Sequence, residues 1–290
     1  MLKSIRSKQV VTIGAVMLLM FYLFSRDIKG LVKPKDETTN KGPAAGEQMA
    51  DKTPAVIDLA EVSTAAKNSL GANIASEITS LEQAYNSAPE SEKGFAAKAL
   101  SQKWDSVDQD LPSALYLEIR ATKAKTLPDW LAAGDKFVKA FDNTRDSVLL
   151  PALLQRANAS YKNALALDST SIDAKTGLGI TIVNGMGMPM QGIAMLLDVV
   201  KKDPKNLKAN MSLGTFAIKS GQFDKAITRF NDIIAIKPSP DAYFYLATAY
   251  ESLGKNSEAI DAYVKSKKLA GNPTLSKFID DKIIELKSKS

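Results

Sequence analysis

Residues 207–240 read LKANMSLGTFAIKSGQFDKAITRFNDIIAIKPSP, and their pattern recurs in the residues that follow. A shift of 33 positions aligns the two copies at matched apolar and small residues: Leu213 with Leu246, Gly221 with Gly254, Ala226 with Ala259, and Phe230 with Tyr263. The preceding segment, 172–204, repeats the same pattern at offsets of 34 to 35 residues. A period of this length is typical of proteins built from one repeated pair of helices.

Each copy has the composition of two short amphipathic helices joined by a turn. Large apolar residues recur at spacings of three and four, which places one apolar stripe on each helix. Gly214, Ala247 and Gly179 are small where the two helices of a pair would touch. Because a single pair cannot cover its own apolar faces, the pairs must stack on one another, which predicts an all-α solenoid.

The pattern resembles the tetratricopeptide repeat (TPR). One copy matches that family at seven positions: Leu213, Gly214, Gly221, Phe223, Ala226, Phe230 and Pro238. The next copy matches at seven more: Tyr243, Leu246, Ala247, Tyr250, Gly254, Ala259 and Tyr263. The resemblance implies three repeats over 172–273, a divergent repeat over 127–171 with a long insertion near 144–156, and a capping helix over 274–290.

The region 55–126 is also rich in helix-forming residues, with turn signals between the helical segments. It is either a divergent continuation of the repeats or a separate helical unit. Before residue 172 the sequence predicts six helices, over 55–69, 72–87, 91–107, 112–125, 128–142 and 147–167.

Several classes of protein are disfavoured by composition, since the 290 residues include no His and no Cys. A Ser-His-Asp triad, a Cys nucleophile, and zinc or iron–sulfur sites of the usual kind all need those side chains. The first 35 residues hold seven basic and one acidic residue and so carry the whole net charge of +6. Residues 36–290, which include the predicted solenoid, are therefore neutral overall, unlike a domain that binds nucleic acid.

The amino-terminal charge flanks an apolar stretch, VVTIGAVMLLMFYLF, at residues 10–24. We predict a basic tail over 1–8, a transmembrane signal anchor over 9–25 and a flexible linker over 26–54, which is rich in Pro, Gly, Thr and charge. A cleaved signal peptide or a buried helix are the alternatives for the apolar stretch. The flanking charges are nearly balanced. By its position the span predicts a single-pass inner-membrane protein with a cytoplasmic amino terminus and an extracytoplasmic, periplasmic body.

The TPR resemblance also implies a site for a protein partner. In that family, positions 2, 5, 9 and 12 of the first helix of each pair line the concave face. In this chain they form the predicted concave face: Asp173, Thr176, Ile180, Val183, Lys208, Met211, Thr215, Ile218, Asp241, Phe244, Thr248 and Glu251. Only Lys208 resembles the clamp of TPR proteins that hold a terminal carboxylate. The mixed surface favours a helix or extended peptide, or a part of this chain itself.

A methionine-rich turn is the other unusual feature. Met186, Met188 and Met190 alternate with other residues between two predicted helices of one repeat. Their thioethers favour packing within the stack, with contact to a partner as the second interpretation. Binding of Cu(I) is a third.

Other patterns that suggest chemistry have simpler explanations. The glycines of Gly177-Leu178-Gly179 lie inside a predicted helix rather than between a strand and a helix, so they predict close packing and not a phosphate loop. The carboxylate pairs Asp105/Asp108 and Asp280/Asp281 lie on polar helix faces, where acid–base catalysis is not expected. We therefore expect no catalytic residues, no cofactor and no metal.

These observations predict a non-enzymatic, membrane-anchored TPR adaptor or scaffold that binds a protein partner through its concave face. The layout resembles bacterial cell-envelope proteins associated with the translocon or with envelope assembly. The alternatives are a cytoplasm-facing membrane receptor with the same groove, and a structural protein that assembles into a homo-oligomer. An enzyme based on the region 55–125 is the least favoured interpretation.

Overall fold

The computed structural model describes residues 56–288, and within this range it contains helices and connecting turns but no strand. The predicted basic tail, signal anchor and linker all lie outside the described residues. The helices are α2 (Leu59–Asn68), α3 (Ala72–Ser87), α4 (Lys93–Asp105), α5 (Asp110–Ala124), α6 (Leu127–Asn143), α7 (Leu150–Leu167), α8 (Ile172–Gly185), α9 (Pro189–Lys202), α10 (Leu207–Lys219), α11 (Phe223–Ile236), α12 (Pro240–Ser252), α13 (Asn256–Ala270) and α14 (Pro273–Ser288). Between residues 56 and 288, none of these helices combines the length and the apolar character that a membrane crossing requires.

The helices that open the three predicted repeats begin in the same way. Ser171, Asn206 and Ser239 precede α8, α10 and α12, and each side chain accepts a hydrogen bond from the backbone N–H three residues later, at 3.0–3.2 Å. This contact satisfies one of the amide groups left unpaired at a helix start. Capping chemistry thus sets the start of each repeat.

The turns within the repeats depend on glycine. Gly221 and Gly254 follow α10 and α12, and both adopt a φ of +70°. Residues with a Cβ rarely take this left-handed conformation, whereas glycine does so without penalty. The same residue type at the same place in two repeats therefore reverses the chain after the first helix of the pair.

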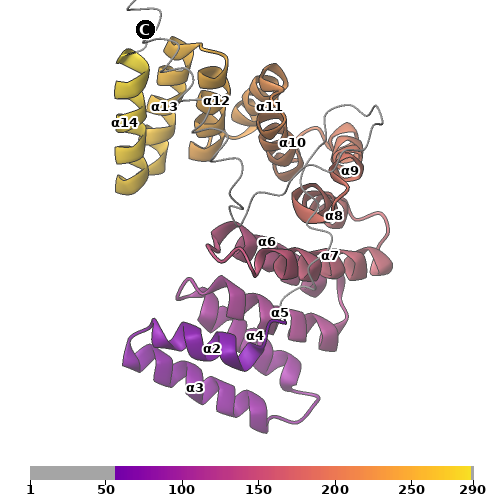
Figure 1. The fold of residues 1–290 in the computed structure, drawn as a ribbon. Helices are drawn as coiled ribbons and strands as arrows, with labels where there is room; N and C mark the ends of the chain where they lie inside the picture. Colours follow the sequence, from indigo (N-terminus) through magenta and orange to yellow (C-terminus); the bar gives the residue numbers. More distant parts are fainter. Residues whose placement is uncertain (1–55, 289–290) are drawn as a thin grey trace, which may run out of the picture. The chain divides into compact units, whose positions relative to one another are not determined.

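Consecutive helices pack in order from α3 to α14, which is the arrangement of an all-helical solenoid (Figure 1). First helices also touch across the pairs, as α6 does with α8, α8 with α10, and α10 with α12. The apolar core follows this order as successive clusters, each shared by neighbouring pairs. The predicted all-α solenoid is confirmed for the described part of the chain.

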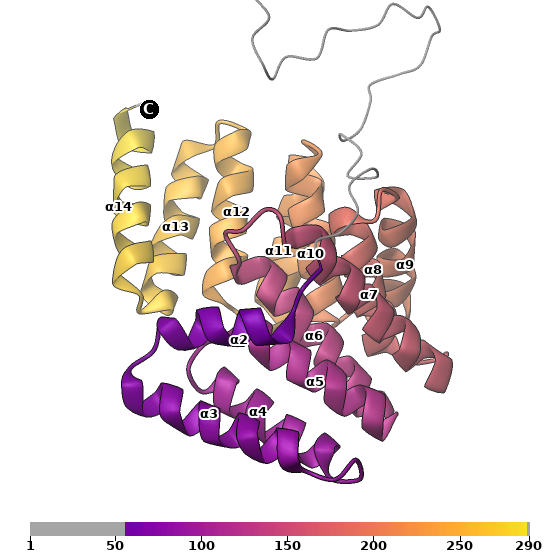
Figure 2. The same cartoon turned by 60° about the horizontal axis from the view of Figure 1, so that its bottom comes forward.

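The amino-terminal helices join the same stack. Helix α2 packs on α3 and α5, and α5 packs on α6 (Figure 2). Arg156 of α7 reaches back to this region, where it pairs with Glu118 of α5 and donates to the carbonyl of Ile57. The region 56–124 therefore shares contacts with the repeats, and its description as TPR-like remains a prediction.

Two predicted segments differ in detail from the structure. The helix expected over 112–125 begins at Asp110, because Pro112 lies in its first turn, where a missing N–H breaks no hydrogen bond. The insertion expected over 144–156 is a short connection of residues 144–149, followed by the first turns of α7. Pro151 is compatible with that helix for the same reason.

Candidate protein-interaction surface

Helix α8 contributes less to the predicted concave face than its sequence suggests. Asp173 is exposed, but the Thr176 side chain is only 1% exposed and its hydroxyl donates to the carbonyl of Ile172 at 2.8 Å. Ile180 and Val183 are half-buried against the apolar cluster between α8, α9 and α10. Asp173 is therefore the one exposed residue of this predicted set on α8.

Lys208 has a partner within the chain. Its ammonium lies 2.8 Å from a carboxylate oxygen of Asp135, which belongs to α6, two pairs earlier. The other carboxylate oxygen of Asp135 accepts a hydrogen bond from the Tyr161 hydroxyl at 2.7 Å. This ion pair joins α10 to α6, two helices that both contact the intervening α8.

The Tyr161 hydroxyl can approach Asp135 because α6 and α8 carry glycine where the Tyr161 ring packs. A Cβ added at Gly134 of α6 would lie 2.7 Å from the Tyr161 ring, and one at Gly177 of α8 would lie 2.2 Å from it. The ring is therefore seated against two helices at positions where no other residue type leaves room. Burial raises the pKa of the Tyr161 hydroxyl, as do the carboxylates of Asp135, Asp142 and Asp173, so this hydroxyl remains a hydrogen-bond donor.

Helix α10 keeps a row of partly accessible side chains. Met211, Thr215 and Ile218 are half-buried. Met211 and Ile218 pack at one edge against the apolar cluster that extends to α14. Thr215 donates to the carbonyl of Ser212 at 3.1 Å, which leaves its oxygen able to accept a hydrogen bond.

On α12, two of the predicted residues already contact the capping helix α14. Phe244 packs against Phe278 of α14, with ring centroids 6.0 Å apart, and Glu251 accepts a hydrogen bond from Lys282 at 2.9 Å. Glu251 also accepts from the Tyr263 hydroxyl at 2.7 Å. The hydroxyl of Thr248 donates to the carbonyl of Phe244. Asp241, in contrast, is exposed.

The structure adds a residue that the sequence analysis missed. Asp142, at the end of α6, is exposed, yet neighbouring protein atoms displace part of its hydration and raise the pKa of its carboxyl, while the charge of Lys219 opposes that shift. Its charge also influences Tyr161 of α7 and Tyr245 of α12. A carboxylate in the last turn of a helix is unfavourable to the helix dipole, and this was the available signal.

Comparison with known proteins agrees with the geometry. Residues 241–268, which span α12 and most of α13, match the sequence profile described as the tetratricopeptide repeat. This segment is a tetratricopeptide repeat. The predicted resemblance to the TPR family is thereby confirmed for residues 241–268. No curated protein matches the sequence.

Two solved structures share the fold. The crystal structure of TTC0263, a thermophilic TPR protein of Thermus thermophilus, matches with a TM-score of 0.54 and 16% identity, over 66% of this chain and 99% of that chain. The crystal structure of the APC/C hetero-tetramer Cut9–Hcn1 matches with a TM-score of 0.55 and 17% identity, over 79% of this chain. The match spans 41% of that chain.

Met186, Met188 and Met190, at the junction of α8 and α9, separate into two groups. Met186 is half-buried and packs on the core cluster that includes Leu178. Met188 and Met190 are exposed, at 58% and 71%. Packing within the stack thus accounts for Met186 and not for the other two.

The structure also describes the carboxylate pairs. Asp105 forms an ion pair with Lys136, Asp280 with Lys267, and Asp281 with Lys277. Within residues 56–288, no three acidic side chains gather in a way that could hold a metal ion. Gly179 lies against Leu196 and the backbone of Gly192, so close helix packing is what this glycine provides.

Proposed function

We propose that this protein is a non-enzymatic TPR scaffold that holds a protein partner along its predicted concave face. The observation that carries the proposal is the row on α10, where Met211, Thr215 and Ile218 remain partly accessible beside exposed Asp173 and Asp241. Such a mixed row offers apolar contacts and charges to a helix or an extended segment.

The same contacts limit where the partner binds. Phe244 and Glu251 are engaged by α14, and Lys208 is engaged by Asp135. A partner on α10 would therefore lie between the Lys208–Asp135 ion pair and the capping helix. The charged groups of the bound protein would meet Asp173 or Asp241 without displacing another side chain of this protein.

We further propose that residues 9–25 anchor the scaffold in a bacterial inner membrane, with the amino terminus in the cytoplasm and the solenoid in the periplasm. Support comes from the sequence, in which an apolar stretch is flanked by the whole net positive charge. A linker of the length of 26–54 has an r.m.s. reach of roughly 30 Å, which keeps the partner near the bilayer.

Photo-cross-linking tests the predicted concave face. A photoreactive amino acid replaces Met211 or Thr215 in the full chain, and Asn231, exposed on α11, serves as the matched control. We expect a discrete cross-linked partner from α10 and none from α11. Equal cross-linking from all three positions, or none from α10, contradicts the proposal. Cross-links to a second copy would favour the self-assembling alternative.

Protease accessibility tests the proposed location independently. An epitope at the carboxyl terminus is followed in intact cells, in cells with a permeabilised outer membrane, and in lysed cells. Cleavage after permeabilisation places the solenoid in the periplasm. Protection until lysis contradicts that location and favours the cytoplasm-facing receptor, without affecting the interaction on α10.

A further inference from the structure

Helix α9 exposes apolar side chains along one face. Met190 is 71% exposed and Leu197 is 46% exposed, with exposed Ala194 between them. These three residues are spaced i, i+4 and i+7, so they lie in one line along the helix. We call this line the α9 face. It belongs to the second helix of its pair, whereas the predicted concave face is built from first helices.

The neighbouring pairs show that the fold does not require this line. Helices α9, α11 and α13 begin at equivalent positions, 34 and 33 residues apart. The residues equivalent to the α9 face are Asp224, Thr228 and Asn231 on α11, and Ser257, Asp261 and Val264 on α13, and all six are exposed. Five of the six are polar, so the apolar line is a property of α9 and not of the helix pair.

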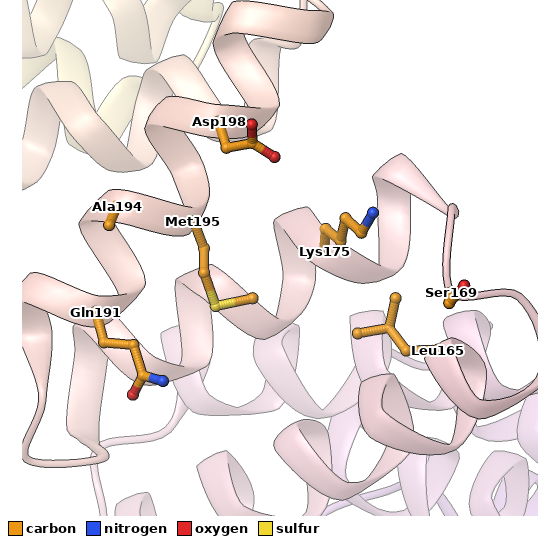
Figure 3. A pocket seen from close by; sticks show the side chains of 7 residues that line it. All are labelled: Leu165, Ser169, Lys175, Gln191, Ala194, Met195 and Asp198. Carbon is orange, nitrogen blue, oxygen red and sulfur yellow. The ribbon is translucent and has the colours of Figure 1, made fainter.

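A groove continues from the α9 face. It has a volume of about 500 Å³ and is lined mainly by carbon atoms. Its lining residues are Leu165, Ser169, Lys175, Gln191, Ala194, Met195 and Asp198 (Figure 3). Ala194 belongs to both the groove and the α9 face, so the two form one surface. Its size suits one or two large apolar side chains.

The charges at this surface favour an acidic occupant. The carboxylate of Asp198 is 2.7 Å from Lys202, whose hydrogen bond lowers the pKa of that carboxyl. Asp168 accepts hydrogen bonds from the backbone and the hydroxyl of Thr170. Within residues 56–288, no hydrogen bond or ion pair is formed by the ammonium of half-buried Lys175, although its charge acts at longer range on the carboxylates of Asp168 and Asp198. An ammonium that lines an apolar groove without a direct partner gains from a carboxylate brought to it.

We propose that the α9 face and its groove bind an amphipathic helix of a partner protein, with apolar side chains against Met190, Ala194 and Leu197 and an acidic side chain paired with Lys175. This is the helix-in-groove mode of recognition, in which apolar anchors recur at i, i+4 and i+7. It gives the scaffold a second interaction surface, independent of the row on α10.

The test uses the full-length protein with ¹³C-labelled methionine methyl groups. The probe is a synthetic amphipathic helix with leucines at i, i+4 and i+7 and glutamates beside them, and a second peptide carries lysines instead. We expect the glutamate peptide to shift the signals of Met190 and Met195, while Met211 on α10 stays unchanged. No shift with the glutamate peptide, or shifts of Met211 alone, overturns the proposal.

Substitutions based on the equivalent positions of α11 and α13 provide a test variant and a matched control. Met190→Asp with Leu197→Asn gives α9 the residues that α11 already carries at these positions, so the fold should be retained. We expect this variant to weaken binding at least tenfold. Val264→Asn removes an apolar side chain of similar exposure at the same position of α13 and should leave binding unchanged.

Two further experiments distinguish an acidic partner helix from other occupants of this surface. Lys175→Gln should reduce the preference for the glutamate peptide over the lysine peptide. An equal preference in the unaltered protein overturns the assignment of an acidic partner. If instead the protein alone shows a concentration-dependent mass that Met190→Asp with Leu197→Asn abolishes, the occupant is a second copy of this chain and the proposal fails.

Discussion

Tyr161 illustrates how one side chain fixes the register of neighbouring helices. Its ring is nearly fully buried and lies against Gly134 and Gly177, while its hydroxyl is bonded to Asp135. The ring therefore cannot move aside without losing both its packing and its hydrogen bond. Because the ring is fixed, the positions of these two glycines tolerate a larger residue less well than glycine positions on open helix surfaces do.

Gly177→Ala should destabilise the protein. Alanine normally stabilises a helix interior by about 1 kcal/mol relative to glycine, but here its Cβ would overlap the Tyr161 ring, and overpacking costs about 1–3 kcal/mol. We expect a net loss in the free energy of unfolding, measured by urea denaturation. Gly94→Ala is the control, since its nearest neighbours lie at 3.4 Å. A stabilised Gly177→Ala variant would contradict the packing described.

Asp142→Asn should stabilise the protein at neutral pH. Dehydration raises the folded-state pKa of this carboxyl, so its charged form is disfavoured in the fold, and that penalty is present above the folded pKa and absent below the unfolded value. We expect the melting temperature to rise by about 1–2 °C at pH 7 and to match the unaltered protein near pH 3. A gain that persists at pH 3 would show that the charge is not its cause.

At the scale of the element, α14 ends the stack. Ile279 and Leu286 are buried, and Leu275 and Ile283 pack beside them against α12 and α13. The opposite side carries Lys277 and Asp281, which pair with each other. A helix with one apolar and one polar side is what the last exposed repeat of a solenoid needs.

Ile279→Ala should lower the stability of this end by about 2–4 kcal/mol, because it leaves a cavity at a fully buried position. Ile284→Ala removes the same atoms from a side chain that is 68% exposed, and should change stability by less than about 0.5 kcal/mol. Urea titration followed by circular dichroism measures both. Equal effects of the two substitutions would show that α14 does not cap the stack.

The sequence predicted the elements better than their long-range contacts. The 33- and 35-residue offsets coincide with the starts of α8, α10 and α12, because caps and glycine turns act within a few residues. The meeting of Lys208 with Asp135 was not predictable, since 73 residues separate them. The same limit applies to Glu251 and Lys282, and it is why the α14 contacts were missed.

At the scale of the solenoid, stability comes mainly from contacts between neighbouring pairs of helices. Each pair of helices touches mainly the next pair, and the core consists of successive clusters. In such a stack the two ends are expected to respond separately to local substitutions. Both tryptophans, Trp104 in α4 and Trp130 in α6, lie in the amino-terminal half of the described range.

Two spectroscopic probes should therefore report different transitions. Ile279→Ala should shift the urea midpoint measured by circular dichroism while leaving the tryptophan fluorescence midpoint unchanged. Leu100→Ala, at a buried position in α4, should shift the fluorescence midpoint. Coincident shifts of both probes in both variants would mean that the stack unfolds as one cooperative unit.

The contacts of Asp135 have a mechanical consequence. Through the Tyr161 hydroxyl and the Lys208 ammonium, this carboxylate ties α7 and α10 to α6, and the Tyr161 ring is wedged against α8. A repeat of about 33 residues releases about 110 Å of chain when it is pulled out. Under force applied at the carboxyl terminus, α14 would detach first, and α12 and α13 would then be released in a step of that length. The segment from α6 to α10 would then resist together and extend in one longer step.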